Sequence, residues 1–135
     1  MTNTHREKIS VITINLNNAE GLRRTLDSVF RQTTHDFELV VVDGASTDGS
    51  VELIHTHADR IDRWVSEPDG GIYNAMNKAV AMATGEYVIF MNSGDTFYED
   101  DVLARVILQL KGKDIYVGDL HRPGKRKKFV KAPEE

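Results

Sequence analysis

The sequence contains no cysteine, which excludes disulfide bonds and metal sites built on thiolates. It also lacks long apolar runs, since the longest are far shorter than the roughly 20 residues that a membrane-spanning helix requires. The first ten residues are polar and charged where a secretory signal peptide would be apolar. With 135 residues, the chain can build one core but hardly two. We therefore expect a cytoplasmic protein with a single compact domain.

The charge is distributed unevenly along the chain. The net charge is −4, but six Lys and Arg residues follow His121 and face only two glutamates there, so that residues 1–120 carry a net charge of −8. An acidic body argues against binding to nucleic acid, which needs a basic face. We interpret the basic segment 121–135 first as a solvated terminal tail, with contact to anionic lipid or a phosphorylated ligand as the alternative.

Short apolar strands alternate with amphipathic helices. Strands are predicted at residues 9–14, 37–42, 63–66, 87–91 and 115–117, and helices at 19–31, 51–57, 72–84 and 102–110. This alternation indicates βαβ units, and hence an α/β fold with a Rossmann-like, mainly parallel sheet and helices on both faces. The strands are almost purely apolar, as expected for a sheet that is covered on both sides.

Polar segments follow each of the first four predicted strands, at residues 15–18, 43–50, 66–71 and 92–95. In open α/β sheets, ligands bind outside the carboxyl ends of the strands. We therefore expect these four segments to lie along one edge of the sheet and to form the binding site.

Two carboxylates in these segments suggest specific chemistry. Asp43 ends a buried strand and lies too far upstream to cap the next helix, so it is a fixed acceptor suited to the imino hydrogen of a nucleobase. Asp95 follows another buried strand, and a carboxylate there suits Mg²⁺ or Mn²⁺, which bind one or two carboxylates plus substrate phosphates. The plainer alternative is that Asn92 and Asp95 only form a turn. No G-x-G-x-x-G motif follows the first strand, so the usual dinucleotide fingerprint is absent.

Three segments, in their order and spacing, resemble the nucleotide-sugar-binding half of family 2 glycosyltransferases, which are inverting enzymes of GT-A fold. They are ISVITINLNN, FELVVVDGASTDGS and SEPDGGIYNAMNKAVAMATGEYVIFMNSGD. The similarity covers roughly residues 8 to 119. The third segment looks most like bacterial members that build polysaccharides such as exopolysaccharide or O-antigen.

The resemblance implies a site for a nucleotide-diphosphate sugar. The end of the first strand would line the base and ribose pocket, and the end of the second would contact the base. A loop after the third strand would close over the nucleotide with a helix beneath it, and residues 92–95 would bind the diphosphate and a cation. Asp95 would be the metal ligand for Mg²⁺ or Mn²⁺. The other predicted binding residues are Thr13, Asn15, Leu16, Asn17, Glu20, Asp43, Asp69, Gly71, Asn77, Lys78, Asn92, Ser93 and Gly94.

The chain departs from the family pattern at four positions. Asn92 and Gly94 stand where many members have aspartates, which leaves Asp95 as the charged residue of that segment. Gly44 replaces the second residue of a common Asp-Asp pair, and Leu16 replaces a frequent aromatic residue, so that base stacking should be weaker.

The resemblance also implies a division of the chain. Residues 1–120 would be the nucleotide-sugar-binding domain, and residues 121–135 the start of an acceptor-binding half that is truncated here. The general base that deprotonates the acceptor hydroxyl is therefore expected beyond residue 135. The implied function is inverting sugar transfer to a saccharide or lipid-linked acceptor in bacterial cell-surface polysaccharide synthesis. From its charge alone, we expect the basic tail to contact the inner face of the membrane. The alternative is a non-catalytic nucleotide-binding fragment or assembly module.

Overall fold

Six strands form one sheet in the order β3-β2-β1-β4-β6-β5. The computed structural model describes residues 9–109, 115–122 and 125–131, with side chains described up to Gln109. The strands are β1 (Ile9–Asn15), β2 (Glu38–Asp43), β3 (Arg63–Ser66), β4 (Tyr87–Phe90), β5 (Ile115–Arg122) and β6 (Lys125–Lys131). The helices are α1 (Ala19–Phe30), α2 (Ser50–Thr56), the short 3₁₀ helix η1 (Ala58–Arg60), α3 (Ile72–Met82) and α4 (Val102–Gln109).

The first four strands are parallel and define the ligand edge. The chain moves outward from β1 through β2 to β3, then returns to place β4 on the other side of β1. The strand order therefore reverses between β1 and β4, which is where open α/β sheets bind ligands. The register sets Asn15 opposite Asp43 and Asp43 opposite Ser66, so the polar strand ends lie side by side. The predicted α/β architecture and mainly parallel sheet are confirmed.

The basic segment near the end of the chain was not predicted to be a strand. Residues Lys125–Lys131 form β6, which pairs antiparallel with both β4 and β5. Its run of Lys and Arg lacks the apolar residues by which the other strands were predicted. Strand pairing uses backbone hydrogen bonds, which do not depend on the type of side chain. β5 also extends to Arg122, five residues beyond the predicted end. The division of the chain at residue 120 stays a prediction, but the sheet continues across it.

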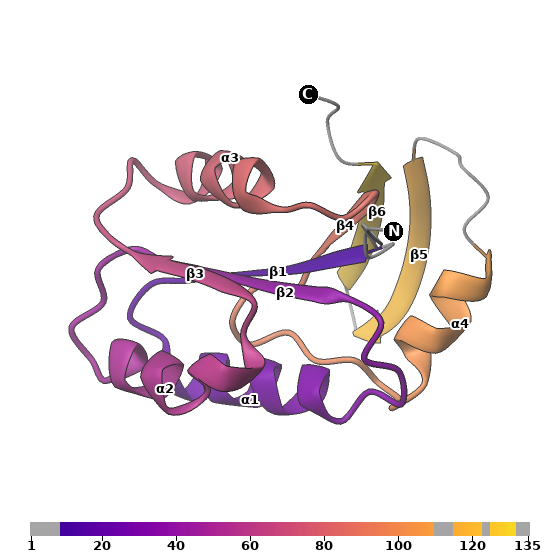
Figure 1. Cartoon of the computed structure of the whole chain (residues 1–135), viewed down its shortest axis with the longest axis horizontal. Helices are drawn as coiled ribbons and strands as arrows, with labels where there is room; N and C mark the ends of the chain where they lie inside the picture. The colour runs from indigo at the N-terminus through magenta and orange to yellow at the C-terminus, as the bar shows by residue number, and fades with distance from the viewer. Residues whose placement is uncertain (1–8, 110–114, 123–124, 132–135) are drawn as a thin grey trace, which may run out of the picture.

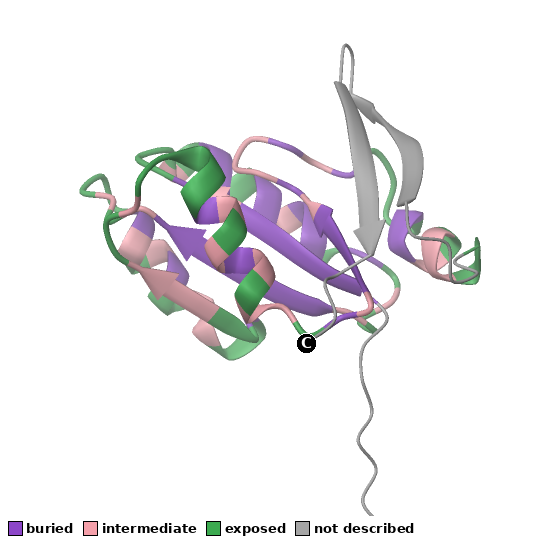
Figure 2. Cartoon of the chain, turned by 90° about the horizontal axis from the view of Figure 1, so that it is seen from above, coloured by how far each residue is buried: buried purple, intermediate pink, exposed green. Residues whose placement is uncertain are grey.

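Side chains alternate between the two faces along each strand, so that one apolar core forms on each face of the sheet. Successive strand residues point to opposite faces. On one face Val11 and Val41 pack with residues of α1 and α2, and on the other Ile12 and Val40 pack with Ala75 of α3. Accordingly, α1 and α2 cover one face and α3 the other (Figure 1). Figure 2 shows the central strands as buried and the outer surface of α3 as exposed. None of the described helices is both long and apolar enough to span a membrane.

The buried carboxylate of Glu38 lies at the edge of the sheet opposite the ligand edge and joins several elements there. Glu38 is 5% exposed and accepts hydrogen bonds from Ser10 Oγ (2.6 Å), Thr84 N (2.9 Å) and Arg63 Nε (2.8 Å). Burial raises the pKa of Glu38, but these hydrogen bonds outweigh it and hold the pKa below its ordinary value. Because Thr84 is bound to Glu38, α3 ends at Met82, two residues before the predicted end.

Candidate functional site

A pocket of ≈ 220 Å³ opens at the carboxyl ends of β1 and β4, where the strand order reverses. Its walls come from the end of β1, the residue that caps α1, the loop before α3 with the first turn of that helix, and the residues that follow β4. The lining residues are Ile14, Asn15, Leu16, Asn18, Asp69, Gly71, Ile72, Ala75, Asn92 and Ser93. Three of the four polar segments predicted to share an edge therefore contribute to one pocket.

The predicted site residues fall into two groups. Those that line the pocket are Asn15, Leu16, Asp69, Gly71, Asn92 and Ser93. Those that lie outside its lining are Thr13, Asn17, Glu20, Asp43, Asn77, Lys78, Gly94 and Asp95.

Asp43 is fully buried, and its carboxylate is saturated with hydrogen bonds. Oδ1 accepts from Asn15 Nδ2 (2.8 Å) and Ser46 Oγ (2.7 Å), and Oδ2 accepts from Ser46 N (2.8 Å) and Ser66 Oγ (2.8 Å). Burial raises the pKa of Asp43, but the bonds from Ser46, Asn15 and Ser66 outweigh it and hold the pKa below its ordinary value. A carboxylate has about four acceptor sites. The predicted contact with a nucleobase stays a prediction, and it would require one of these bonds to open.

A polar chain joins three strand ends behind the pocket. Ser93 Oγ donates to Asn15 Oδ1 (2.7 Å), and Asn15 Nδ2 in turn donates to Asp43. Asn15 is only 2% exposed, so both ends of its amide are fixed by these neighbours. The network orients Ser93 and Asn15 at the pocket wall before any ligand arrives.

The residues that follow β4 form a tight corner, residues 92–95, called the β4 corner below. Gly94 has a φ of 101°, in the left-handed region that favours glycine. Its N–H donates to Gly21 O (3.1 Å) and to Thr25 Oγ1 (2.9 Å), both in α1. Thr25 Oγ1 also donates to Asp95 O (2.7 Å). Asp95 is 4% exposed at this corner and outside the pocket lining.

The loop before α3 closes the opposite wall. Gly71 N donates to Asp69 Oδ1 (3.0 Å), and Gly71 has a φ of 112° that other residues rarely adopt. A Cβ at position 44 would lie 3.1 Å from Asp69 Oδ2 and 3.3 Å from Leu16 Cδ1. Gly44 therefore allows Asp69 and Leu16 to approach each other over it. This close approach is a physical reason for glycine at this departure from the family pattern.

Apolar residues rim the mouth of the pocket. Leu16 is 60% exposed and Ile72 54% exposed, and both line the pocket; Tyr73, next along α3, is 80% exposed. Large apolar side chains left open at a pocket mouth are typical of surfaces that contact a ligand or another part of a protein.

Two predicted residues in and just after β1, Thr13 and Asn17, lie outside the pocket lining. Thr13 is fully buried within β1, and its hydroxyl has no hydrogen-bond partner among the described residues. Asn17 has a φ of 49°, and its Oδ1 accepts from Thr47 N (2.8 Å) while its own N–H donates to Ser46 Oγ (2.8 Å). Asn17 thus shapes the turn after β1 and ties it to the loop after β2.

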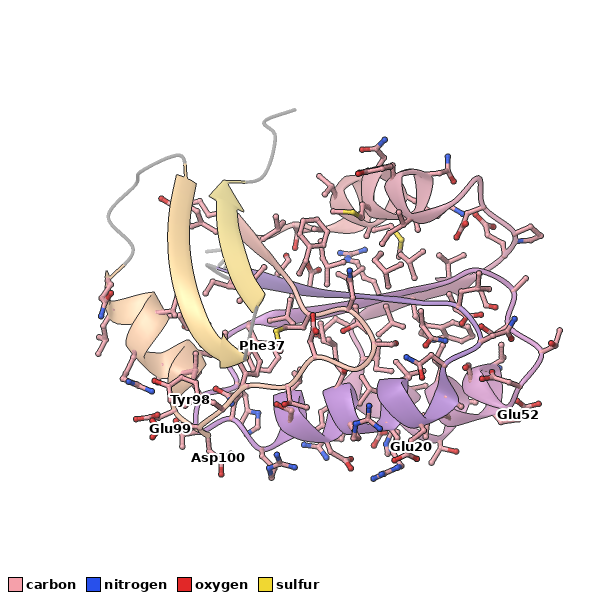
Figure 3. All side chains as sticks on the ribbon, turned by 180° about the vertical axis from the view of Figure 1, so that it is seen from behind. Glu20, Phe37, Glu52, Tyr98, Glu99 and Asp100 are labelled. Carbon is pink, nitrogen blue, oxygen red and sulfur yellow. The ribbon has the colours of Figure 1, made fainter. Side chains whose placement is uncertain are left out.

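Three predicted residues lie on helix surfaces. Glu20 points away from the sheet on the outer side of α1 (Figure 3). It accepts a hydrogen bond from Arg23, which lowers the pKa of Glu20. Asn77 is exposed on α3. Lys78 forms an ion pair with Glu67 (2.8 Å) in the loop before that helix. None of the three lines the pocket.

Several residues at the site were not predicted individually from the sequence. Asn18 lines the pocket and caps α1, with its Oδ1 accepting from Gly21 N (3.1 Å). Asparagine just before a helical pattern is a strong capping signal, but capping alone does not predict that a residue faces a ligand. Ser46 and Ser66 were not predicted to bind Asp43, because sequence spacing does not reveal which hydroxyls meet a strand end.

The oxygens near the β4 corner can be tested for their fit to the implied cation. Mg²⁺ and Mn²⁺ prefer oxygen ligands. Asn92 Oδ1 is buried and has no hydrogen-bond partner among the described residues, and Asp95, at the same corner, has a carboxylate and is 4% exposed. Within the described part of the chain, no group of three or more His, Cys, Asp or Glu could hold a metal ion. This set fits a cation that takes most of its ligands from a diphosphate and water.

The fold is a Rossmann-like α/β domain with a pocket at the reversal of strand order, and comparison with known proteins identifies the family. Residues 10–134 match Glycosyl transferase family 2, and the chain belongs to this family. A PGL/p-HBAD biosynthesis glycosyltransferase of Mycobacterium bovis is 41% identical over 117 residues, covering 82% of this chain and 46% of that protein. An uncharacterized glycosyltransferase of Mycobacterium tuberculosis is 40% identical over 111 residues, covering 82% of this chain and 42% of that protein.

Solved structures show the same architecture. The mannosyltransferase PcManGT from Pyrobaculum calidifontis, in complex with GDP-Man and Mn²⁺, has a TM-score of 0.72 and 29% identity, covering 84% of this chain and 35% of that one. TarS from S. aureus, in complex with UDP-GlcNAc, has a TM-score of 0.70 and 27% identity, covering 80% of this chain and 33% of that one. The predicted GT-A fold is confirmed. The chain spans less than half the length of the curated relatives described above.

Proposed function

We propose that this chain is the donor-binding part of an inverting glycosyltransferase, which binds a nucleotide-diphosphate sugar in the pocket between the ends of β1 and β4. The observation that carries the proposal is the position of this pocket at the reversal of strand order in a chain of Glycosyl transferase family 2. Structural neighbours hold GDP-Man or UDP-GlcNAc, which supports a nucleotide sugar as the ligand class.

The surroundings of the pocket suit an anionic ligand. The α3 helix begins at the pocket wall, where Gly71 and Ile72 contribute to the lining, and the α1 cap Asn18 contributes to another wall. Helix N-termini present unpaired N–H groups and a partial positive charge, which favour phosphate. A diphosphate near these two helix starts would be stabilised without a large basic cluster.

The remaining parts of a nucleotide sugar have matching surfaces. The apolar rim formed by Leu16 and Ile72 suits one face of a base, and the carboxylate of Asp69 suits a ribose hydroxyl or a base N–H. Asn15 and Ser93 add fixed polar groups between them.

Asp95 and Asn92 Oδ1 would hold Mg²⁺ or Mn²⁺ at the β4 corner. When bound, such an ion supplies positive charge that stabilises the departing nucleotide diphosphate. The protein residues themselves orient the donor: the Ser93–Asn15–Asp43 chain fixes the pocket wall, and the anchored β4 corner fixes the position of the diphosphate.

Inverting transfer also needs a base to deprotonate the acceptor hydroxyl while its oxygen attacks C1 of the sugar and the nucleotide diphosphate leaves. We propose that this base lies in an acceptor-binding part beyond residue 135. The acceptor would be a saccharide or a lipid-linked saccharide in bacterial polysaccharide synthesis. The basic segment that contains β6 would bring the protein to the cytoplasmic face of the membrane.

Calorimetric titration of the 135-residue chain with UDP, GDP and dTDP, in Mn²⁺ and in EDTA, tests the proposal. We expect at least one of the three to bind and Asn92→Ala to weaken that binding, with Glu52→Ala, an exposed change on α2, as the control. Failure of all three nucleotides to bind would refute the donor-binding role. Nucleotide binding without sugar transfer or donor hydrolysis would instead favour a non-catalytic module.

A further inference from the structure

A second set of polar groups lies at the β4 corner, toward α1. A Cβ at Gly94 would lie 3.9 Å from Asn18 Nδ2 and 4.0 Å from Arg24 Nη2. The space beside Gly94 is therefore bordered by an amide nitrogen and a guanidinium nitrogen, both of which only donate hydrogen bonds. Such a space favours an anion, whereas a cation there would face the charge of Arg24.

The backbone holds this arrangement in place. The N–H of Gly94 donates to both Gly21 O and Thr25 Oγ1. The Asn18 side chain is held in its capping position, and a Cβ at Gly21 would lie 2.3 Å from Asn18 Nδ2. The helix turn that carries Arg24 is thus bonded directly to the corner that it faces.

The guanidinium of Arg24 keeps donors available. Its neighbour Arg23 binds Glu20 and Asp27 through hydrogen bonds. Arg24, in contrast, has one ion pair among the described residues, with its Nη1 at 3.6 Å from the Glu20 carboxylate, a distance too long for a hydrogen bond. The Arg24 side chain is 49% exposed, and a guanidinium carries five N–H donors.

We propose that Arg24, assisted by Asn18, binds the diphosphate of the nucleotide donor beside Gly94. This inference rests on the proposed function and adds a specific charged ligand to it. The position of a Cβ at Gly94 is about 1 Å too far from Asn18 Nδ2 and Arg24 Nη2 for a hydrogen bond. A ligand oxygen that lies about 1 Å closer to both nitrogens would therefore be at hydrogen-bond distance from each. Arginine binds phosphate through two parallel, charge-assisted hydrogen bonds, which suits this opening. The missing side chain at Gly94 then gives a phosphate access to Arg24.

The test compares nucleoside diphosphates with nucleosides in calorimetric titrations of the full 135-residue chain. UDP, GDP, uridine and guanosine are titrated in EDTA and, separately, in Mn²⁺. We expect Arg24→Ala to weaken the binding diphosphate by about tenfold or more and to change nucleoside binding by less than about twofold. Arg24→Lys, which keeps the charge but loses the paired donors, should fall between the two.

Arg23→Ala is the matched control, since this neighbour is also exposed on α1 but pairs with Glu20 and Asp27. It should bind both diphosphates within about twofold of the wild type. Arg24→Gln provides a second uncharged variant, and thermal unfolding verifies that each variant is folded.

The possible results separate the two proposals. If the wild type binds UDP or GDP and Arg24→Ala binds it equally well in both buffers, the role of Arg24 is overturned but the donor-binding function is not. Equal losses in Arg24→Ala and Arg23→Ala, or equal losses for diphosphate and nucleoside, would overturn it as well. A wild-type chain that binds none of the four ligands would overturn the donor-binding function together with this subsite.

Discussion

Asn15 donates a hydrogen bond from Nδ2 to Oδ1 of Asp43 over 2.8 Å, across the adjacent ends of β1 and β2. The bond orients the Asn15 amide so that its Oδ1 faces Ser93, at the end of β4. One buried carboxylate thereby controls the polar groups at the pocket wall, although it does not line the pocket itself. Its loss should affect both the fold and the site.

Replacing Asp43 with asparagine should destabilise the fold. The new NH₂ group would face donors from Asn15, Ser46 or Ser66, so that about two hydrogen bonds are lost and one buried donor clashes with another. We expect the free energy of unfolding to fall by about 2–3 kcal/mol in urea titrations at pH 7. Asp59→Asn, an exposed change in η1, is the control and should stay within about 0.5 kcal/mol of the wild type. Equal stability of the two variants would contradict this role of Asp43.

The stability of the protein should depend on pH through Glu38 and Asp43. The pKa of each is lower in the folded chain than its ordinary value, which is 4.5 for Glu38 and 3.8 for Asp43. Both residues therefore bind more protons in the unfolded chain, and stability is lost as the pH falls below these ordinary values and through the lower folded ones. We expect the free energy of unfolding to be nearly constant from pH 7 to 6 and to fall steadily below about pH 4.5.

Glu38→Gln isolates one of these two groups. At pH 7 it should lower the free energy of unfolding by about 2 kcal/mol, because Gln cannot accept all the bonds from Ser10, Thr84 and Arg63. The difference from the wild type should shrink as the pH falls below 4.5 and Glu38 itself becomes protonated. Glu52→Gln, an exposed change on α2 (Figure 3), is the control. A difference that stays constant down to pH 3 would contradict the assignment.

Gly85 should not tolerate even a methyl group. A Cβ there would lie 2.7 Å from Ser10 N and 2.8 Å from Ile9 C, which are backbone atoms of β1 that cannot move aside. We expect Gly85→Ala to lower stability by about 3 kcal/mol or to prevent folding. In Gly70→Ala, the nearest atom would be Asn74 Cβ at 3.6 Å, an ordinary contact. Thermal unfolding of the two variants makes the comparison, and similar unfolding temperatures would be the adverse result.

Most of the fold could be predicted from the sequence because the strands that carry it are apolar and the helices have a clear periodicity. The predicted strand at 63–66 coincides with β3, and the predicted end of β1 is one residue early. β6 escaped prediction because its residues are mostly basic, and only the open edges of β4 and β5 determine that this segment pairs. A long-range backbone partner leaves no local signal.

The candidate site could be located but not detailed. Residues at strand ends had to share an edge in a parallel sheet, and this placed Asn15, Asp69 and Asn92 at one pocket. The hydrogen bonds that saturate Asp43 come in part from two serine hydroxyls, one in the loop after β2 and one at the end of β3, and sequence spacing does not encode these contacts. The position of Arg24 depends on how α1 packs against the β4 corner, and this too requires three-dimensional structure.

Asp95→Asn should separate the cation from the rest of the donor site. We expect the variant to lose the gain in UDP or GDP affinity that Mn²⁺ gives the wild type, while its affinity in EDTA changes little. Comparing both buffers within one variant cancels any loss of stability, which matters because Asp95 is 4% exposed. Asp101→Asn, an exposed change before α4, is the control. A Mn²⁺ effect as large in Asp95→Asn as in the wild type would exclude Asp95 as a metal ligand.

Leu16→Ser should weaken nucleotide binding without destabilising the fold. Leu16 is 60% exposed, so little apolar burial is lost in the free protein, but a base covering its side chain would lose this apolar contact. We expect the affinity for the preferred nucleoside and its diphosphate to fall by about five- to tenfold alike, because the contact is with the base. Leu108→Ser is the matched control, since Leu108 is 78% exposed on α4 and outside the pocket lining. Loss confined to the diphosphate would instead place Leu16 near the phosphates, and no loss would remove it from the site.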